Sequence, residues 1–525
     1  MFRRRNCLVP LLLVMTSVFG THGLRGQDSR NSDELPAVPA SLFAMSARVD
    51  EQLDERLGQE GWQPAGASSD ATFLRRARFD LTGVPPTASE VIDFVKDAGS
   101  DKRNRLIESL LRSPASAKHL AETWAGWMLP EGGDLQLDSG RQGLQRWLRD
   151  RFAENLRYDR LVADLLVSRG PPQSGPTAFF VSLEGKPEKI AAKTARVFLG
   201  LQLDCAQCHD HPFDHWKQTD FWGLAAYFAQ LSIDSEAAMQ FNAEVSDTDQ
   251  GDVTLPGSER VVSPAPLVQT GYSHLTTGTR RQQLTLWLTA PENPFMARAA
   301  VNRVWSLLFG RGLIEPVDDM RSLEMASHPQ LLSELSEYFA SSGYDLRNLL
   351  HMLAMTRAYS RAGLHESGLP PENSYAILPA KPLTETQLAA QLAYVARQLS
   401  GEAGEVSDAA LKRQLGKLRG DGGEAKLGMV SALVTLHGEA FNAVSSDGQS
   451  RLLKALQAPH LDARGQVRWL FLSTLSREPT SVEMQALSQL NSGVEGGGDA
   501  TESPLQWQSD LLWALINSTE FAMTP

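Results

Sequence analysis

Cys205, Cys208 and His209 are the residues of this chain whose types and spacing point most directly to chemistry. Two thiols three positions apart, with a histidine directly after the second, form the pattern of c-type haem attachment. In such a site each thiol bonds to one vinyl group of the porphyrin, and the histidine ligates the iron. The pattern predicts a covalent haem c with His209 as the proximal ligand, and it leaves the sixth iron position open.

The same segment offers two alternatives to haem. Zinc or iron accepts thiolate, imidazole and carboxylate ligands, so a metal site would draw on Cys205, Cys208, His211, Asp214 and His215. A small disulfide between the two cysteines, with no cofactor, is the third reading, and an oxidising compartment favours it. The sequence leaves all three open.

Residues 1–26 have the composition of a secretory signal peptide. Three arginines at positions 3–5 precede a short apolar run over 8–20, and small residues follow it. The run is shorter than the roughly 20 residues that span a bilayer, so we expect no integral membrane span in the mature chain. The expected location is extracytoplasmic, either periplasmic or secreted, where covalent haem attachment is completed.

Composition limits both the fold and the partners. The chain has 525 residues and three cysteines, so its fold must rest on a hydrophobic core rather than on disulfides. The formal net charge is −12, and it becomes −16 without the four arginines of residues 1–26. Such a surface disfavours nucleic acid. We expect instead a redox partner or an extracytoplasmic ligand such as polysaccharide.

Helical periodicity dominates the chain and predicts a mainly α, multi-helical protein. The clearest apolar face follows a predicted N-cap at Asp345 and consists of Leu346, Leu349, Leu350 and Leu353. Capping boxes mark three further helix starts, at Thr87 with Glu90, Thr384 with Gln387 and Thr480 with Glu483.

Breaks in the periodicity predict two helical domains. We expect a flexible leader over 27–44, a helical domain with the cysteine motif over 45–231, and a second helical domain over 281–522, interrupted by a flexible stretch at 400–426. Residues 232–280 are rich in Gly, Pro, Ser and Thr and contain short β-like pieces such as Val261-Val262. They predict a small β-containing insert or linker.

Several segments carry a resemblance to a known pair of domains. The first domain resembles the planctomycete-type secreted cytochrome-like domain of unknown function in the segments Arg75 to Thr87, Phe198 to Asp214 and Asp220 to Leu224. The second resembles the domain of unknown function that usually follows it, in the segments Asn293 to Trp305, Phe309 to Gly312, Pro316 to Arg321, Ser327 to Pro329 and Ser342 to Leu346. The resemblance covers most of residues 45–522. It implies a cytochrome-like protein with one potential haem site and no established activity.

A second candidate site is a dense set of charged and amide side chains in the second domain, namely Arg298, Asn302, Arg303, Asp319 and Arg321. Bidentate arginines suit carboxylate and sulfate, so the set predicts a pocket for an anionic or sugar-like ligand. The commoner role of arginines beside aspartates is a buried ion-pair network that fixes one helix against another, and the sequence favours that role.

Two further motifs are given structural rather than catalytic roles. Arg75, Arg76, Arg78 and Asp80 are expected to form another such network. Ser327-His328-Pro329 lacks the glycines of a nucleophile elbow, and no phosphate loop or dinucleotide fingerprint occurs. Serine hydrolases and nucleotide-dependent enzymes are therefore disfavoured, and no catalytic residue is assigned.

Overall fold

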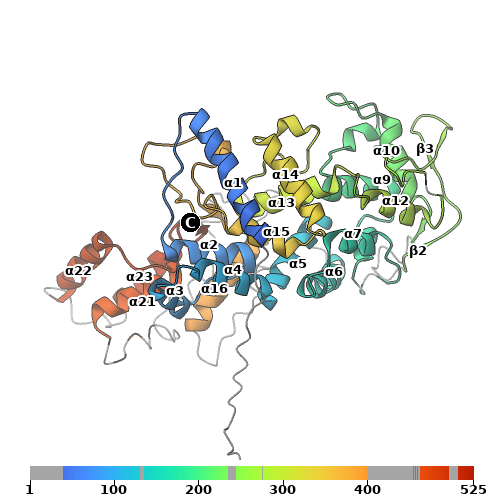
Figure 1. Ribbon diagram of the computed structural model, residues 1–525. Helices are drawn as coiled ribbons and strands as arrows, with labels where there is room; N and C mark the ends of the chain where they lie inside the picture. The colour runs from blue at the N-terminus through green and yellow to red at the C-terminus, as the bar shows by residue number, and fades with distance from the viewer. Residues whose placement is uncertain are drawn as a thin grey trace, which may run out of the picture. The chain divides into compact units, whose positions relative to one another are not determined.

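Helices make up most of the structure, a computed structural model that describes residues 40–130, 135–171, 173, 175–233, 244–274, 276–399, 453, 456, 458, 461–495 and 506–525 (Figure 1). Eighteen α-helices lie in this part of the chain, where the strands form only two-stranded sheets. The prediction of a mainly α protein is confirmed. The predicted signal peptide and the stretch at 400–426 lie outside the described residues.

The first predicted domain contains α1 (Ala40–Gln59), α2 (Asp70–Thr82), α3 (Ala88–Lys96), α4 (Lys102–Arg112), α5 (Pro114–Met128), α6 (Leu135–Ala153), α7 (Tyr158–Leu166), α8 (Ala178–Ser182), α9 (Pro187–Thr194), the π-helix η2 (Ala195–Leu199), the 3-10 turns η3 (Asp204–Gln207) and η4 (Ala226–Phe228), and α10 (Gln218–Ala225). The second contains α12 (Arg280–Leu288), α13 (Met296–Phe309), η5 (Leu323–Met325), α14 (Pro329–Ser341), α15 (Leu346–Ala354), η6 (Glu372–Ser374), α16 (Glu385–Leu399), α21 (Ala463–Leu475), α22 (Ser481–Glu495) and α23 (Gln506–Ile516). No helix among the described residues is long and apolar enough to cross a membrane.

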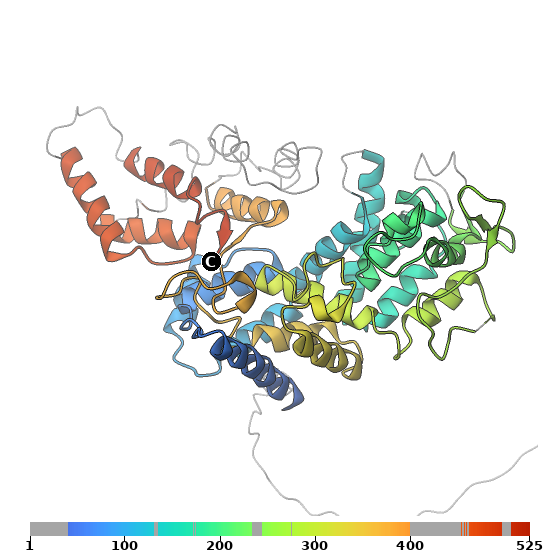
Figure 2. The ribbon, with the colours of Figure 1, turned by 90° about the horizontal axis from the view of Figure 1, so that it is seen from above.

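Helix α1 begins at Ala40, inside the stretch expected to be a flexible leader. Its residues Leu42, Val49, Leu53 and Leu57 recur at helical spacing and are all buried. The helix contacts α14 and α15 of the second predicted domain (Figure 2). Burial of this apolar face stabilises the helix from its first turn.

The predicted helix starts are confirmed by their hydrogen bonds. Thr87 Oγ1 accepts from the Glu90 amide, and the Glu90 carboxylate accepts from the Thr87 amide. The same reciprocal bonds occur between Thr384 and Gln387 and between Thr480 and Glu483. Asp345 caps α15 by accepting from the Asn348 amide at 2.9 Å. Each cap satisfies backbone donors that the helix itself leaves free.

The strands are short and pair in antiparallel twos. In the expected β-containing region, β1 (Leu231–Ser232) pairs with β2 (Ser246–Asp247), and β3 (Val253–Thr254) pairs with β4 (Val261–Val262). A third pair joins β5 (Lys381–Pro382) to β6 (Met523–Thr524). The sequence did not predict this last pair, because nothing local indicates that the chain's end returns to residue 381.

The two predicted domains share one compact unit from Ala40 to Pro525. Phe79 of α2 belongs to the same buried apolar cluster as Leu392, Leu470 and Leu512, from α16, α21 and α23. Helix α13 likewise contacts η2. The segment that leads into the cysteine motif is therefore packed against a helix about 100 residues later in the sequence.

Candidate functional site

The cysteine motif begins in the 3-10 turn η3, which contains Cys205, and continues into the segment before α10, which contains Cys208 and His209. We call residues 204–217 the cysteine loop. Cys205 and Cys208 are both exposed free thiols, so the structure contains no disulfide between them. Ala206, between the two, is fully buried. The loop therefore presents two thiols to solvent while its backbone is anchored in the core.

Two side chains of α10 hold this loop through its carbonyl groups. Gln218 Nε2 donates to the carbonyls of Gln207 and Cys208, at 3.2 and 3.0 Å. The indole Nε1 of Trp222 donates to the Gln207 carbonyl at 3.0 Å. These bonds fix the backbone around Cys208 and leave its thiol uninvolved.

His209 is exposed, and one of its ring nitrogens is engaged. Its Nδ1 lies 2.7 Å from the carbonyl oxygen of Asp210. A carbonyl can only accept, so this contact makes Nδ1 the protonated nitrogen and leaves the Nε2 lone pair available. Histidines that ligate a metal are usually held in this way by a backbone carbonyl or carboxylate.

The alternative metal ligands do not converge. His211 Nδ1 accepts from the Phe213 amide at 3.3 Å, while His215 Nδ1 lies 2.6 Å from Asp214 Oδ1. In the described part of the chain, no three His, Cys, Asp or Glu side chains are grouped as a metal ion requires. A site built from Cys205, Cys208 and these residues would need the loop to rearrange.

The second candidate set is dispersed along its helix and the following loop. Asn302 is 0% exposed, and its amide group exchanges two hydrogen bonds with the backbone of Ile314, at 2.9 and 3.0 Å. Arg303 is 6% exposed, donates to the Arg196 carbonyl at 2.7 Å and lies over the ring of Trp127. Both side chains therefore hold other parts of the chain in place.

The remaining members of that set are Asp319, Arg321 and Arg298. Asp319 and Arg321 form an ion pair with each other at 3.1 Å. Arg298 is half-buried, and burial lowers the pKa of its guanidinium. These contacts favour the structural network over the ligand pocket.

Arg75 and Arg76 of α2 bond backbone carbonyl groups, whereas the sequence predicted an ion-pair network of these arginines with Asp80. Arg75 donates to the carbonyls of Thr474, Phe521 and Met523, at distances from 3.2 to 3.3 Å. Arg76 donates to the carbonyls of Tyr359 and Arg361. These buried guanidinium groups join the first predicted domain to the C-terminal residues.

A buried polar cluster forms around Asp80, and its partners Lys381 and Tyr359 were not predicted from the sequence. Asp80 accepts from Lys381 Nζ at 2.7 Å and from the Tyr359 hydroxyl at 2.8 Å. Burial raises the pKa of the Tyr359 hydroxyl well above its ordinary value. Lys381 also donates to the carbonyls of Leu307 and Leu308 at the end of α13, where a cation is favoured by the helix dipole.

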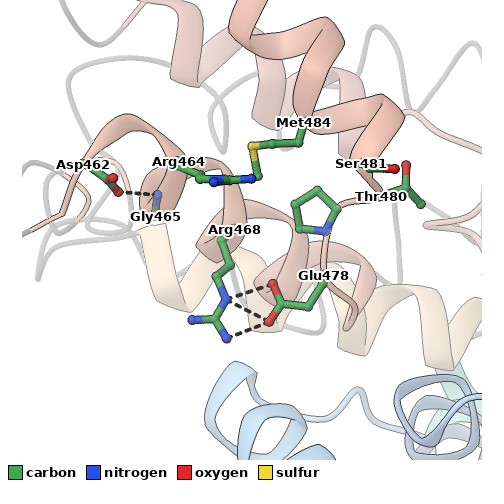
Figure 3. Close-up of a pocket in the computed structure, with 9 residues that line it drawn as sticks. Asp462, Arg464, Gly465, Arg468, Glu478, Thr480, Ser481 and Met484 are labelled. Atoms are coloured by element: carbon green, nitrogen blue, oxygen red, sulfur yellow. Dashed lines mark hydrogen bonds and ion pairs between the residues drawn. The ribbon is translucent and has the colours of Figure 1, made fainter.

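Two polar grooves lie away from the cysteine motif. One, of about 460 Å³, is formed by residues around the starts of α21 and α22, and there Arg468 pairs with Glu478 at 2.6 Å (Figure 3). The other, of about 480 Å³, lies between α1 and the start of α14 and includes His328. Burial lowers the pKa of His328 to about 4, so its ring is neutral near pH 7. Neither groove is lined by a predicted site residue.

Two family models match the chain, in the order that the resemblance implied. PSCyt2, described as a protein of unknown function (DUF1549), matches residues 48–232. PSD1, described as a protein of unknown function (DUF1553), matches residues 280–417. No curated protein and no solved structure matches the chain. The cysteine loop lies in the first matched region, and Asn302 and Arg303 lie in the second.

Proposed function

Since the chain belongs to the proteins in which a PSCyt2 domain precedes a PSD1 domain, we propose that it is an extracytoplasmic cytochrome-like protein with one covalently bound haem c. Cys205 and Cys208 would form the two thioether bonds, and His209 would be the proximal ligand. Bound haem supplies one-electron transfer, so the proposed role is redox chemistry with a partner outside the cytoplasm.

The observation that carries this proposal is the state of the His209 ring. Its Nδ1 is engaged by the Asp210 carbonyl, which keeps Nε2 free as a ligand nitrogen. The two thiols that attachment needs are free and exposed on the same short loop. Phe213, four residues after His209, is 82% exposed and offers an apolar surface that a porphyrin would shield from water.

The test is to express the chain with a haem-attachment system and examine the denatured protein. We expect a Soret band that persists after acid and organic extraction, since thioether bonds survive both. Cys205→Ser and Cys208→Ser should each weaken attachment, and His209→Ala should change the iron coordination seen in the spectrum. His211→Ala is the matched control in the same loop and should leave the Soret band unchanged.

Other outcomes would replace the proposal. A colourless protein with stoichiometric zinc or iron, lost in His211→Ala or His215→Ala, would assign a metal site. A colourless, metal-free protein whose mass shows Cys205 bonded to Cys208 would assign a structural disulfide and remove the argument for redox function.

Export is a separate part of the proposal. It rests on the arginines at 3–5 and the apolar run at 8–20. N-terminal sequencing of exported protein should find a first residue between Thr21 and Asp28. A retained Met1 on the folded protein would contradict both the signal peptide and haem attachment outside the cytoplasm.

A further inference from the structure

Asp318 of the PSD1 domain contacts the segment that leads into the cysteine motif. Its Oδ2 lies 3.4 Å from Arg196 Nη1, and its Oδ1 accepts from Gln202 Nε2 at 2.9 Å. Arg196 Nε in turn lies 2.9 Å from Asp204 Oδ2. Asp204 directly precedes Cys205, so two ion pairs through one arginine connect the second domain to the first thiol-bearing residue.

The backbone of the same segment is held from the second domain as well. Arg303 donates to the Arg196 carbonyl at 2.7 Å, and the Met320 amide donates to the Gly200 carbonyl at 2.7 Å. Gly200 has φ +67° and ends the π-helix η2. π-Helical turns occur frequently at functional sites.

These contacts have one feature in common. Arg196, Gln202 and Asp204 all belong to the PSCyt2 match, whereas Asp318 belongs to the PSD1 match. Among the described residues, Asp318 forms no hydrogen bond or ion pair with the cysteine motif itself, so its effect on the thiols would pass through Arg196 and Gln202. A half-buried carboxylate that holds two donors of one segment fixes that segment more firmly than a single exposed ion pair does.

We propose that Asp318 is a positioning residue for the cysteine loop, and that it acts through Arg196 and Asp204. It would hold the loop so that Cys205, Cys208 and His209 present one fixed arrangement to a ligand. This inference rests on the proposed function for its purpose, since a fixed arrangement matters for haem attachment. Its physical content, a loop ordered by Asp318, can be tested without any cofactor.

The first experiment uses the cofactor-free, full-length protein with reduced thiols. Asp318→Asn removes the charge that holds Arg196 and keeps the size of the side chain. We expect amide hydrogen exchange at residues 203–209, and the alkylation rate of Cys205 and Cys208 by neutral iodoacetamide, to rise about 3- to 10-fold. Asp319→Asn is the matched control. It changes the net charge by the same amount as Asp318→Asn, but Asp319 pairs with Arg321 and not with Arg196. Equal rates in the two variants would overturn the proposal.

A second variant breaks the same connection from the loop side. Asp204 is exposed, so Asp204→Asn should fold even if Asp318→Asn does not. It should raise the same exchange and alkylation rates, and the double variant should add little to either single change, because both act through Arg196. Fully additive effects on the rates would show that the two carboxylates act independently and would refute the inference.

A third readout separates positioning from general stability. In protein carrying haem, Asp318→Asn should shift the visible bands of the bound haem relative to the Asp319→Asn protein, and Asp318→Glu should restore them. Unshifted bands, with exchange rates unchanged, would contradict the proposal. If no variant and no parent protein binds haem, the proposed function fails, while the exchange and alkylation rates still decide the role of Asp318.

Discussion

Asp80 and Lys381 form a buried ion pair across 301 positions of sequence, with Lys381 Nζ 2.7 Å from Asp80 Oδ1. Their side chains are only 4% and 15% exposed. Lys381 also lies on β5, which pairs with the C-terminal strand β6. The pair therefore stands where α2, the end of α13 and the C-terminal residues meet.

Removing the cation of this pair should be strongly destabilising. Lys381→Met keeps most of the side-chain volume but leaves the Asp80 carboxylate buried without its partner, at a cost of about 3–5 kcal/mol in the free energy of unfolding. Urea unfolding measures the change. The control is Glu478→Gln, which breaks an exposed pair with Arg468 and should cost below ~1 kcal/mol. Equal losses in the two variants would contradict this reading of the buried pair.

The free energy of unfolding should fall as pH is lowered from about 6.5 toward 4. His119, His328 and His351 are buried, and burial lowers the pKa of each from 6.5 to about 4. Between these values the unfolded chain binds more protons than the folded one, so the stabilisation is complete above pH 6.5 and is lost as pH falls.

One histidine can be tested alone by urea unfolding between about pH 7.5 and 4.5. His119→Gln removes one of the three buried imidazoles and should reduce the slope of stability against pH by about one proton. The control is His365→Gln, at a half-buried histidine outside this set of three. An unchanged slope in His119→Gln would contradict the lowered pKa of His119.

Gly200→Ala should destabilise the segment before the cysteine motif. Gly200 has φ +67°, and a Cβ there would collide with Met320. Strain and overpacking together predict a loss of about 1–3 kcal/mol, with faster hydrogen exchange at the cysteine loop. Gly126→Ala on α5 meets no neighbour and should be neutral or slightly stabilising. In the double variant Gly200→Ala/Met320→Ala, the collision with Met320 is removed, so only the part of the stability loss that comes from this collision should be recovered.

Arg303→Met should lower the melting temperature, whereas Arg298→Met should leave it nearly unchanged. Arg303 is buried, bonds the Arg196 carbonyl and covers Trp127, so its loss is expected to cost about 2–3 kcal/mol. Arg298 lies on the same helix and is only half-buried. Thermal unfolding measures both. An unchanged melting temperature for Arg303→Met, with loss of an anionic ligand, would favour the pocket that the sequence also allowed.

The helix starts were predictable because their physics is local. A capping box is completed within four residues, so the sequence around Thr87, Thr384 and Thr480 is sufficient to predict that a helix begins there. The partners of the α2 arginines were not predictable. Arg75 finds an acceptor on Thr474, 399 positions away, and no local pattern specifies which carbonyls fold back to meet it.

The candidate site likewise has features that the local sequence predicts and others that depend on distant segments. The spacing of Cys205, Cys208 and His209 identified the loop, but not the contact of His209 with Asp210 that leaves Nε2 free. The sequence also identified the set that contains Arg298 and Asn302 on α13. Whether such a set faces a cavity or another element depends on the packing of distant segments, and here Asn302 meets the backbone of Ile314.

The bonds from α2 to the end of the chain bear on how the protein is made. Arg75 takes its acceptors from residues 474, 521 and 523, which leave the ribosome long after α2 has been synthesised. Until they emerge, the Arg75 guanidinium stays hydrated, because burying it unpaired is costly. The burial of Arg75 in α2 therefore depends on residues that are synthesised about 400 positions later.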